Sequence, residues 1–166
     1  GRELREGVRT RALQRNNRTR NRIPTIVLIG YTNAGKSTLF NWLTGATVLS
    51  EDMLFATLDP TVRELSLPLG QKVIVADTVG FISHLPTELV EAFKSTLEEV
   101  VYADFLIHVH DASSLMVAEE MADVVKVLDD LGVDVETRRD RIIHLLNKAD
   151  LVRDEEEIDN LKRMFP

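Results

Sequence analysis

The sequence lacks cysteine, long apolar runs, a secretory signal at its start and internal repeats. Without cysteine the protein cannot form a disulfide framework, a condition that fits the reducing cytosol and many other compartments as well. Because no apolar run could span a membrane and no signal segment is present, we expect a soluble, cytoplasmic protein. The length of 166 residues and the apolar share of 44% predict one ordinary domain with a sizeable core.

Positive charge is also scarce over most of the chain, whose formal net charge is -7. Eight arginines lie in residues 1–24 beside only Glu3 and Glu6, which leaves 12 basic and 25 acidic residues in the remainder. Only this arginine-rich segment is therefore suited to a polyanion. Two interpretations stay open: a solvated charged helix or arm, or a segment that contacts RNA or a preceding domain.

Apolar runs alternate with amphipathic segments after Pro24, which is typical of an α/β protein. Runs rich in Val, Ile and Leu predict buried strands at 25–29, 72–77, 105–111 and 141–146. The segment 61–68 predicts a further strand, paired with 72–77 as a hairpin. Helical spacing predicts a helix through Leu43 and helices within 85–100, 115–132 and 154–165, whereas 46–61 is expected to be a long loop. These elements predict a doubly wound, mostly parallel sheet with one antiparallel strand.

The first strand leads into the sequence GYTNAGKST, residues 30–38, which has the spacing of a phosphate-binding P-loop. Gly30 and Gly35 let the backbone turn its N–H groups inward at a helix start, which forms a nest for anions. Lys36 would reach the β and γ phosphates of a nucleoside triphosphate, and the Ser37 hydroxyl would be a ligand of Mg²⁺. A plain glycine turn is the alternative, and the strand before it and the helix after it argue against that alternative.

The sequence DTVG, residues 77–80, follows the buried strand of the hairpin. Ligands of open α/β sheets bind at the carboxyl ends of the strands, so Asp77 is expected beside the phosphate loop, where it holds Mg²⁺ through water. Gly80 could present its N–H to the γ phosphate. The DxxG pattern is weak alone, but its position after a P-loop and a hairpin strengthens it.

The sequence NKAD, residues 147–150, ends the last buried strand and completes the pattern of a guanine-binding protein. The Asp150 carboxylate can accept from the ring N–H and the exocyclic amine of guanine, a donor pair that adenine lacks. Lys148 is expected along the base, and Asn147 is expected to join this loop to the phosphate loop. An isolated NKxD could be a helix start with an aspartate cap. All three patterns in order predict a P-loop NTPase with a Ras-like G domain.

Longer segments resemble one family: GYTNAGKSTLFNWLTG, DMLFATLDPT, DTVGFISHLPTELVEAFKSTLEEV and ADFLIHVHDAS. From about Arg18 to Asp150 the chain closely resembles the GTPase domain of HflX, a translation-factor-class GTPase of bacteria and organelles. The resemblance implies a cytoplasmic, monomeric, Mg²⁺-dependent GTP hydrolase that associates with the large ribosomal subunit and splits stalled ribosomes. It also implies that Thr57 closes over Mg²⁺ and the γ phosphate, whereas the residues alone make Thr61 an equal candidate.

The resemblance also implies domain boundaries. HflX proteins carry an N-terminal domain and a helical subdomain before the GTPase domain, so residues 1–24 are expected to end that subdomain and residues 25–166 to form a G domain. The family's last strand and the SAK-like loop that backs guanine would follow residue 166, so we expect a G domain truncated before them. An exposed sheet edge would then weaken nucleotide binding and stability.

The motifs and the resemblance together predict the residues of the site. The expected catalytic residues are Lys36, Thr57 and Gly80, and the expected Mg²⁺ ligands are Ser37, Thr57 and, through water, Asp77. The expected nucleotide-binding residues are Gly30, Tyr31, Thr32, Asn33, Ala34, Gly35, Lys36, Ser37, Thr38, Phe55, Ala56, Thr57, Leu58, Asp59, Asp77, Thr78, Val79, Gly80, Asn147, Lys148, Ala149 and Asp150.

The hydrolytic step leaves alternatives open. Phe81 stands where many GTPases carry a glutamine that orients water, so slow intrinsic hydrolysis is expected. Asn33 stands where GTPases of the Era and MnmE type, which the loop also resembles, carry an asparagine that helps to bind K⁺; a bond within the loop is the equal alternative. The main hypothesis is a GTPase whose switch loops signal to the ribosome, and the rival is a nucleotide sensor with negligible hydrolysis. Asp150 disfavours an ATPase.

Other conspicuous residues receive ordinary interpretations. His84 is expected to be a solvated loop residue, and Trp42 is expected to pack rather than to stack on a base. The strand patterns account for His108, His110 and His144 without any functional role.

Overall fold

The computed structural model describes residues 23–45, 61–78 and 94–165. Its strands form one sheet in the order β2-β3-β1-β4-β5. The strands are β1 Thr25–Gly30, β2 Thr61–Ser66, β3 Lys72–Asp77, β4 Phe105–Asp111 and β5 Ile142–Asn147. β1 pairs in parallel with β3 and β4, β4 pairs in parallel with β5, and β2 pairs antiparallel with β3. The predicted sheet with one antiparallel hairpin strand is therefore confirmed.

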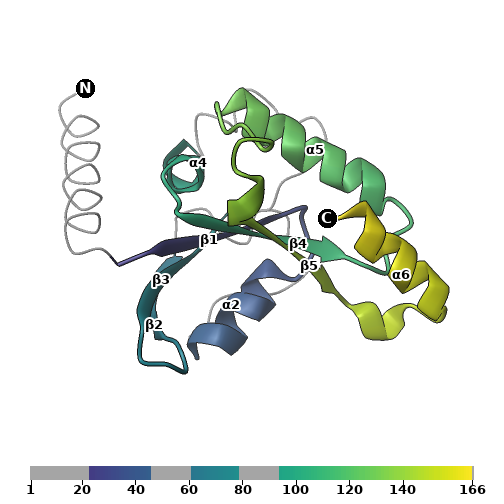
Figure 1. Ribbon diagram of the computed structural model, residues 1–166, viewed down its shortest axis with the longest axis horizontal. Coiled ribbons are helices and arrows are strands. Elements are labelled where there is room, and N and C mark those ends of the chain that lie inside the picture. The colour runs from purple at the N-terminus through teal and green to yellow at the C-terminus, as the bar shows by residue number, and fades with distance from the viewer. Residues whose placement is uncertain (1–22, 46–60, 79–93, 166) are drawn as a thin grey trace.

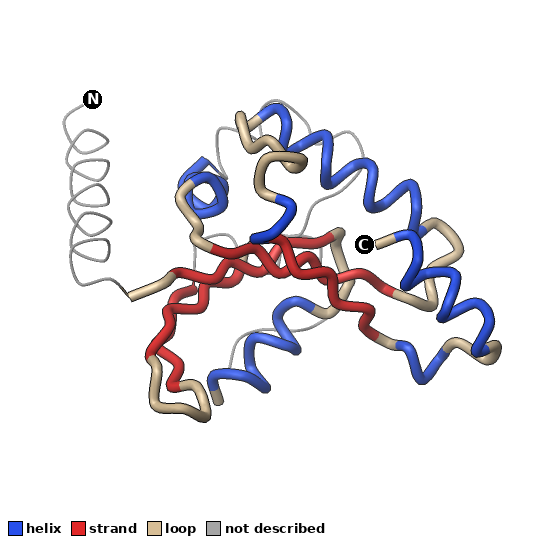
Figure 2. The backbone as a smooth tube through the Cα atoms, viewed as in Figure 1, coloured by secondary structure: helices blue, strands red, loops and turns tan. Residues whose placement is uncertain are grey.

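Helices cover both faces of this sheet (Figures 1 and 2). One face carries α2, and the other carries α4, α5 and α6. The helices are α2 Lys36–Thr44, α4 Lys94–Val101, α5 Val117–Asp130 and α6 Glu155–Met164, with short 3₁₀ turns η1 Arg139–Arg141 and η2 Ala149–Leu151. No helix in the described ranges combines the length and the apolarity that crossing a membrane would require.

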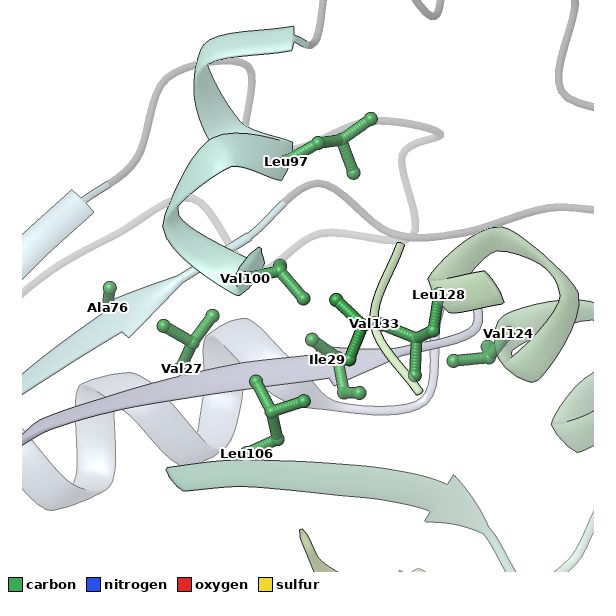
Figure 3. Close-up of a cluster of buried hydrophobic side chains, with 9 residues drawn as sticks. All are labelled: Val27, Ile29, Ala76, Leu97, Val100, Leu106, Val124, Leu128 and Val133. Atoms are coloured by element: carbon green, nitrogen blue, oxygen red, sulfur yellow. The ribbon is translucent and has the colours of Figure 1, made fainter. Parts of the chain in front are cut away.

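The central strand β1 is apolar on both faces because both faces are covered. Val27 and Ile29 point to the side of α4 and α5, where they join a buried cluster (Figure 3). Leu28 points to the opposite side and packs with Phe40 of α2. Successive side chains of a strand alternate between faces, so a strand in the middle layer needs an unbroken apolar run. The other members of the first cluster are Ala76, Leu97, Val100, Leu106, Val124, Leu128 and Val133.

The ends of the elements follow local signals, within one or two residues of the predicted limits. α2 ends at Thr44 before Gly45, and α6 begins after Asp154, whose carboxylate accepts a hydrogen bond from the Glu156 N–H. β5 begins one residue later than predicted because Arg141 belongs to η1. Residues 46–60 of the predicted loop 46–61 lie outside the described residues, as does the predicted helix start at 85–93, whereas Thr61 belongs to β2 and not to a loop.

Candidate functional site

The three predicted motifs lie at the carboxyl ends of β1, β3 and β5. β1 and β3 are neighbours, and Leu28 stands opposite Asp77 in their parallel register. The Thr78 hydroxyl joins the two strands, since it donates to the Leu28 carbonyl oxygen at 2.6 Å. Parallel strands present their carboxyl ends at one edge of the sheet, so the three motifs share the edge at which such folds bind ligands.

The phosphate loop, residues 30–38, doubles back before α2. The Ala34 N–H donates to the Tyr31 carbonyl oxygen at 3.1 Å, and Asn33 and Gly35 adopt positive φ angles of 63° and 101°. Such turns direct successive N–H groups to one side. Within the described residues no side chain caps the first turn of α2, and that turn holds no acidic residue. The helix start and its N–H groups therefore favour a bound anion.

Both glycines of this loop are required by the space around them. A Cβ atom on Gly30 would lie 2.6 Å from the Val109 carbonyl oxygen of β4. A Cβ atom on Gly35 would collide with the side-chain amide of Asn147, and the φ angle of Gly35 is one that other residues rarely adopt. The sequence explained these glycines by their approach to a ligand, and the structure adds their contacts with β4 and with the loop after β5.

Lys36 is buried, with 7% of its surface exposed. Burial lowers the pKa of its ammonium below the usual value, and the Asp77 carboxylate partly opposes this shift. A buried ammonium is costly unless negative charge lies close by. The phosphate loop thus contains a cation that an incoming anion would stabilise.

Ser37 and Asp77 bring two kinds of oxygen together. The Ser37 hydroxyl donates to Oδ2 of Asp77 at 2.9 Å, and the Thr78 N–H donates to Oδ1 of the same buried carboxylate at 2.9 Å. Hydroxyl and carboxylate oxygens are ligands that Mg²⁺ prefers. The donor set at this point therefore fits the Mg²⁺ that the sequence predicted.

The loop after β5 is joined to the phosphate loop by two side chains. The Asn147 amide donates to the Ala34 carbonyl oxygen at 3.0 Å, which is the link between loops that the sequence predicted. Lys148 adopts a left-handed φ of 59°, and its Nζ donates to the Asn33 carbonyl oxygen at 3.0 Å. Asp150 is exposed in η2. A ligand held by the phosphate loop can therefore meet the loop that carries this carboxylate.

Asp111, at the end of β4, was not predicted as a site residue. Its carboxylate accepts a hydrogen bond from Nζ of Lys148 at 3.1 Å. Burial raises the pKa of this carboxyl, but hydrogen bonds from Ser113 and Lys148 outweigh burial and lower it below its usual value. Asp111 thus fixes the Lys148 ammonium. The available signal was an aspartate that ends a buried strand at the same edge as Asp77 and Asn147.

The histidines of β4 and β5 were also given no role. The structure brings His108, His110 and His144 together on one face of the sheet, with their candidate ligand atoms all within 4.8 Å of one another. No sequence motif marks them, because the grouping depends on how β4 and β5 pair.

Part of the predicted site lies outside the described residues, namely Phe55, Ala56, Thr57, Leu58, Asp59, Val79 and Gly80. The roles given to these residues stay predictions, as do those of Phe81 and His84. Thr61, the alternative switch threonine, begins β2 opposite Asp77.

Comparisons of sequence point to one family. Residues 25–164 match the sequence pattern described as "50S ribosome-binding GTPase". The chain is 57% identical over 150 residues to the GTPase HflX of Caldanaerobacter subterraneus subsp. tengcongensis, covering 90% of this chain and 34% of that protein. It is 45% identical over 140 residues to the GTPase HflX of Escherichia coli strain K12, covering 84% and 32%. The chain spans about a third of the length of these curated relatives.

Comparisons of structure agree. A GTP-binding protein from the hyperthermophilic archaeon Sulfolobus solfataricus, crystallised with GDP, is similar at a TM-score of 0.65 and 29% identity, over 96% of this chain and 48% of that chain. Era in complex with MgGDPNP and a segment of 16S ribosomal RNA is similar at a TM-score of 0.62 and 21% identity, over 87% and 48%. The second likeness supports the shared fold alone.

Proposed function

The chain belongs to the family of 50S ribosome-binding GTPases and matches the GTPase domain of HflX proteins, and from this we propose that it binds GTP and hydrolyses it to GDP and phosphate. One observation carries the proposal: Asn147 and Lys148 donate hydrogen bonds to the carbonyl oxygens of Ala34 and Asn33. These bonds hold a phosphate-binding loop and a base-selecting loop in a single site. A glycine turn that merely starts a helix would not need them.

The proposed reaction is an in-line attack of water on the γ phosphorus. The bond between the γ phosphorus and the β–γ bridging oxygen breaks, the water's proton ends on phosphate or in solvent, and negative charge grows on the departing GDP. Among the described residues, the loop N–H groups and the Lys36 ammonium can neutralise that charge. Phosphate oxygens would in turn favour the charged form of Lys36, whose pKa is lowered by burial.

We propose that Mg²⁺ is held by Ser37 directly and by Asp77 through water. The support is the distance of 2.9 Å between the Ser37 hydroxyl and the carboxylate of Asp77, which is itself buried. When bound, the ion supplies positive charge beside the β and γ phosphates. Thr57, which the family resemblance adds to this set, lies outside the described residues.

Asn33 keeps two interpretations. Its φ of 63° lies in the left-handed region that asparagine tolerates better than most residues, so the turn alone accounts for it. The alternative proposal is that its amide oxygen helps to hold K⁺ beside the phosphates. The test compares GTP hydrolysis in K⁺ and in Na⁺ at equal ionic strength. Equal rates, or a K⁺ preference that survives Asn33→Ala, would remove K⁺ from the mechanism.

For the complete protein we propose association with the large ribosomal subunit. The support is the family description and the HflX relatives, of which this chain matches about a third. The arginine-rich residues 1–24 have the charge that suits RNA, although they lie outside the described residues. Co-sedimentation of the complete protein with large subunits, in GTP-analogue and GDP states, tests this association.

Single-turnover cleavage of GTP by the complete protein, with and without large subunits, tests the enzymatic proposal. Cleavage that the subunits stimulate would support a GTPase whose switch loops signal to the ribosome. Tight binding of GTP without cleavage under either condition would support the rival, a nucleotide sensor. Binding of ATP as tight as that of GTP would refute the assignment of Asp150 to the base.

A further inference from the structure

β4 and β5 place three histidines on one face of the sheet. His108 and His110 are two residues apart on β4, so their side chains point to the same face. His144 stands opposite His108 in the parallel register of β4 and β5. This face carries α5 and α6 (Figure 1), and the Phe165 ring, just after α6, stacks on His110 with centroids 4.1 Å apart. The histidines are thus enclosed between two strands and the end of α6.

The imidazole nitrogens are close enough to share one ion. Nε2 of His110 and Nδ1 of His144 lie 2.9 Å apart, and one candidate ligand atom from each of the three residues lies within 4.8 Å of the others. Zinc–nitrogen bonds of about 2.0–2.1 Å place tetrahedral nitrogen ligands roughly 3.4 Å apart. The ring planes are inclined to one another by 24–39°, so binding requires the rings to turn until their lone pairs meet at one ion.

The pKa values of all three rings are lowered, which favours their neutral forms. Burial lowers the pKa of His108 well below its usual value, and the neighbouring histidines add to the effect. Burial, followed by the proximity of His144, lowers the pKa of His110 to about 3, and burial lowers that of His144. A neutral imidazole keeps a lone pair on one nitrogen, so a cation can bind without any net release of protons, although a proton on a facing nitrogen has to move to the other nitrogen of its ring.

Ordinary core packing explains this arrangement poorly. His108 and His110 are 2% and 4% exposed, and an imidazole buried this deeply costs free energy that an apolar side chain at the same position would not. Leu106, two residues before His108 on β4, shows that this face accepts leucine. Three adjacent imidazoles disfavour positive charge on one another, which lowers the pKa values of His108 and His110. Together they offer a set of ligand atoms made of nitrogen alone.

We propose that His108, His110 and His144 form a binding site for one Zn²⁺ ion. Imidazole suits Zn²⁺, whereas the hard cations Mg²⁺ and Ca²⁺ prefer oxygen, which this cluster does not offer. The site is separate from that of Mg²⁺, whose ligands come from α2 and β3. The hydrogen bond between His110 and His144 gives way on binding: the ring that donates it moves its proton to its other nitrogen, so that both facing nitrogens become ligands.

The ion would join β4 to β5 beside the nucleotide site. Its ligands on β4 precede Asp111, and its ligand on β5 precedes Asn147 and Lys148. Asp111 and Lys148 form the ion pair beside the nucleotide site. His144 is only half-buried, so the ion can enter from the side of β5. Because three protein ligands leave one position of a tetrahedron, water would occupy the fourth.

The test is a titration of the untagged, chelator-treated 166-residue chain with Zn²⁺ and with Co²⁺, without nucleotide and in excess Mg²⁺. The chain has no cysteine and four histidines, so few other strong sites compete. We expect one equivalent to bind, Co²⁺ to give the intense visible absorption of a tetrahedral site, and the melting temperature to rise by about 5–10 °C at about 100 times Kd.

The matched variants are His144→Gln and His84→Gln. His144→Gln removes one of the three proposed ligands. Loss of even a residue that only supports a ligand weakens metal binding by about 10–100-fold, so this variant should weaken Zn²⁺ binding by more than about tenfold. His84→Gln should bind Zn²⁺ as the parent chain does. Imidazole nitrogen signals of the parent chain provide a measurement that needs no variant: one equivalent of Zn²⁺ should shift three histidines and spare His84. Binding without saturation, equal affinity of both variants, or unshifted signals of His108, His110 and His144 would overturn the proposal.

Discussion

The phosphate loop and the β4–β5 edge border the same site but are built by different means. In the phosphate loop, residues 30–38, the backbone does the positioning, through positive φ angles of 63° and 101° and the start of α2. At the β4–β5 edge, side chains do it: Asn147 reaches Ala34 across 113 positions of sequence, and Lys148 reaches Asp111 across 37. The loop is a local structure, whereas the edge exists only after the sheet has formed.

This difference predicts how each region responds to substitution. A backbone turn that leaves no space for a side chain is either formed or lost, so a substitution in the phosphate loop should either leave nucleotide binding intact or abolish most of it. Side-chain links can be removed singly while their neighbours remain, so changes at the edge should be graded. Variants of the two regions, measured in one nucleotide-binding assay, test that contrast.

The largest effect is expected for Gly35→Ala in the phosphate loop. A methyl group there collides with the Asn147 amide at a φ angle that alanine rarely adopts. Strain of about 1–3 kcal/mol and the displaced loop should together weaken GTP binding by about a thousandfold. Gly45→Ala is the matched control, because Gly45 also has positive φ, 66°, but no heavy atom of the described residues lies within 4 Å of the added methyl. If both variants lost GTP equally, strain alone would explain the effect.

A smaller but still large effect is expected for Asp150→Asn. An amide replaces a charged double acceptor, and each lost hydrogen bond to a charged group is worth about 1.5–3 kcal/mol, so GTP affinity should fall by about a hundredfold. Xanthine nucleotides, which present a carbonyl in place of the exocyclic amine, should then bind better than guanine nucleotides. Competition between GTP and XTP measures the switch. A variant that kept its preference for guanine would show that another group reads the base.

Local signals explain why so much of the phosphate loop could be predicted. A buried strand, the spacing of Gly30 and Gly35, and the following helix all lie within twenty residues, and the structure has each of them. The link from Asn147 to the phosphate loop was also predicted, but only through the family pattern of three motifs. The collision that forbids a side chain at Gly35 was not, because it involves a residue from another strand.

The β4–β5 edge could be predicted much less completely. Its strands were visible as apolar runs, but the register that sets His144 opposite His108 is fixed by pairing, which no local pattern encodes. Asp111 was missed for a similar reason: its partner, Lys148, approaches it only because β4 and β5 are neighbours in the sheet. Clusters of side chains from neighbouring parallel strands can therefore be recognised only once the structure shows which strands pair and in which register.

An intermediate effect is expected for Asn147→Ala. The variant loses the hydrogen bond to the Ala34 carbonyl oxygen while the backbone of the phosphate loop keeps its shape. One such bond contributes about 0.5–1.5 kcal/mol, so GTP affinity should fall by about tenfold or less. Phosphate-loop variants should remain far more severe in the same assay. A thousandfold loss for Asn147→Ala would mean that the edge is as cooperative as the loop, which would contradict the proposed contrast.

The smallest effect is expected for Asp111→Asn. The Lys148–Asp111 pair spans 3.1 Å, but its side chains are 34% and 21% exposed, so solvent screens much of the attraction. Lys148 also keeps its bond to the Asn33 carbonyl oxygen, which holds the ammonium in place when the carboxylate is gone. GTP affinity should therefore fall by about two- to fivefold, with a larger loss at low salt than at high salt because screening already weakens the pair. Glu64→Gln is the matched control: its pair with Lys72 lies on the hairpin of β2 and β3 at 52% and 60% exposure, and its loss should leave GTP affinity unchanged. A loss for Asp111→Asn that does not vary with salt would show that Asp111 acts through the shape of the loop and not through its charge.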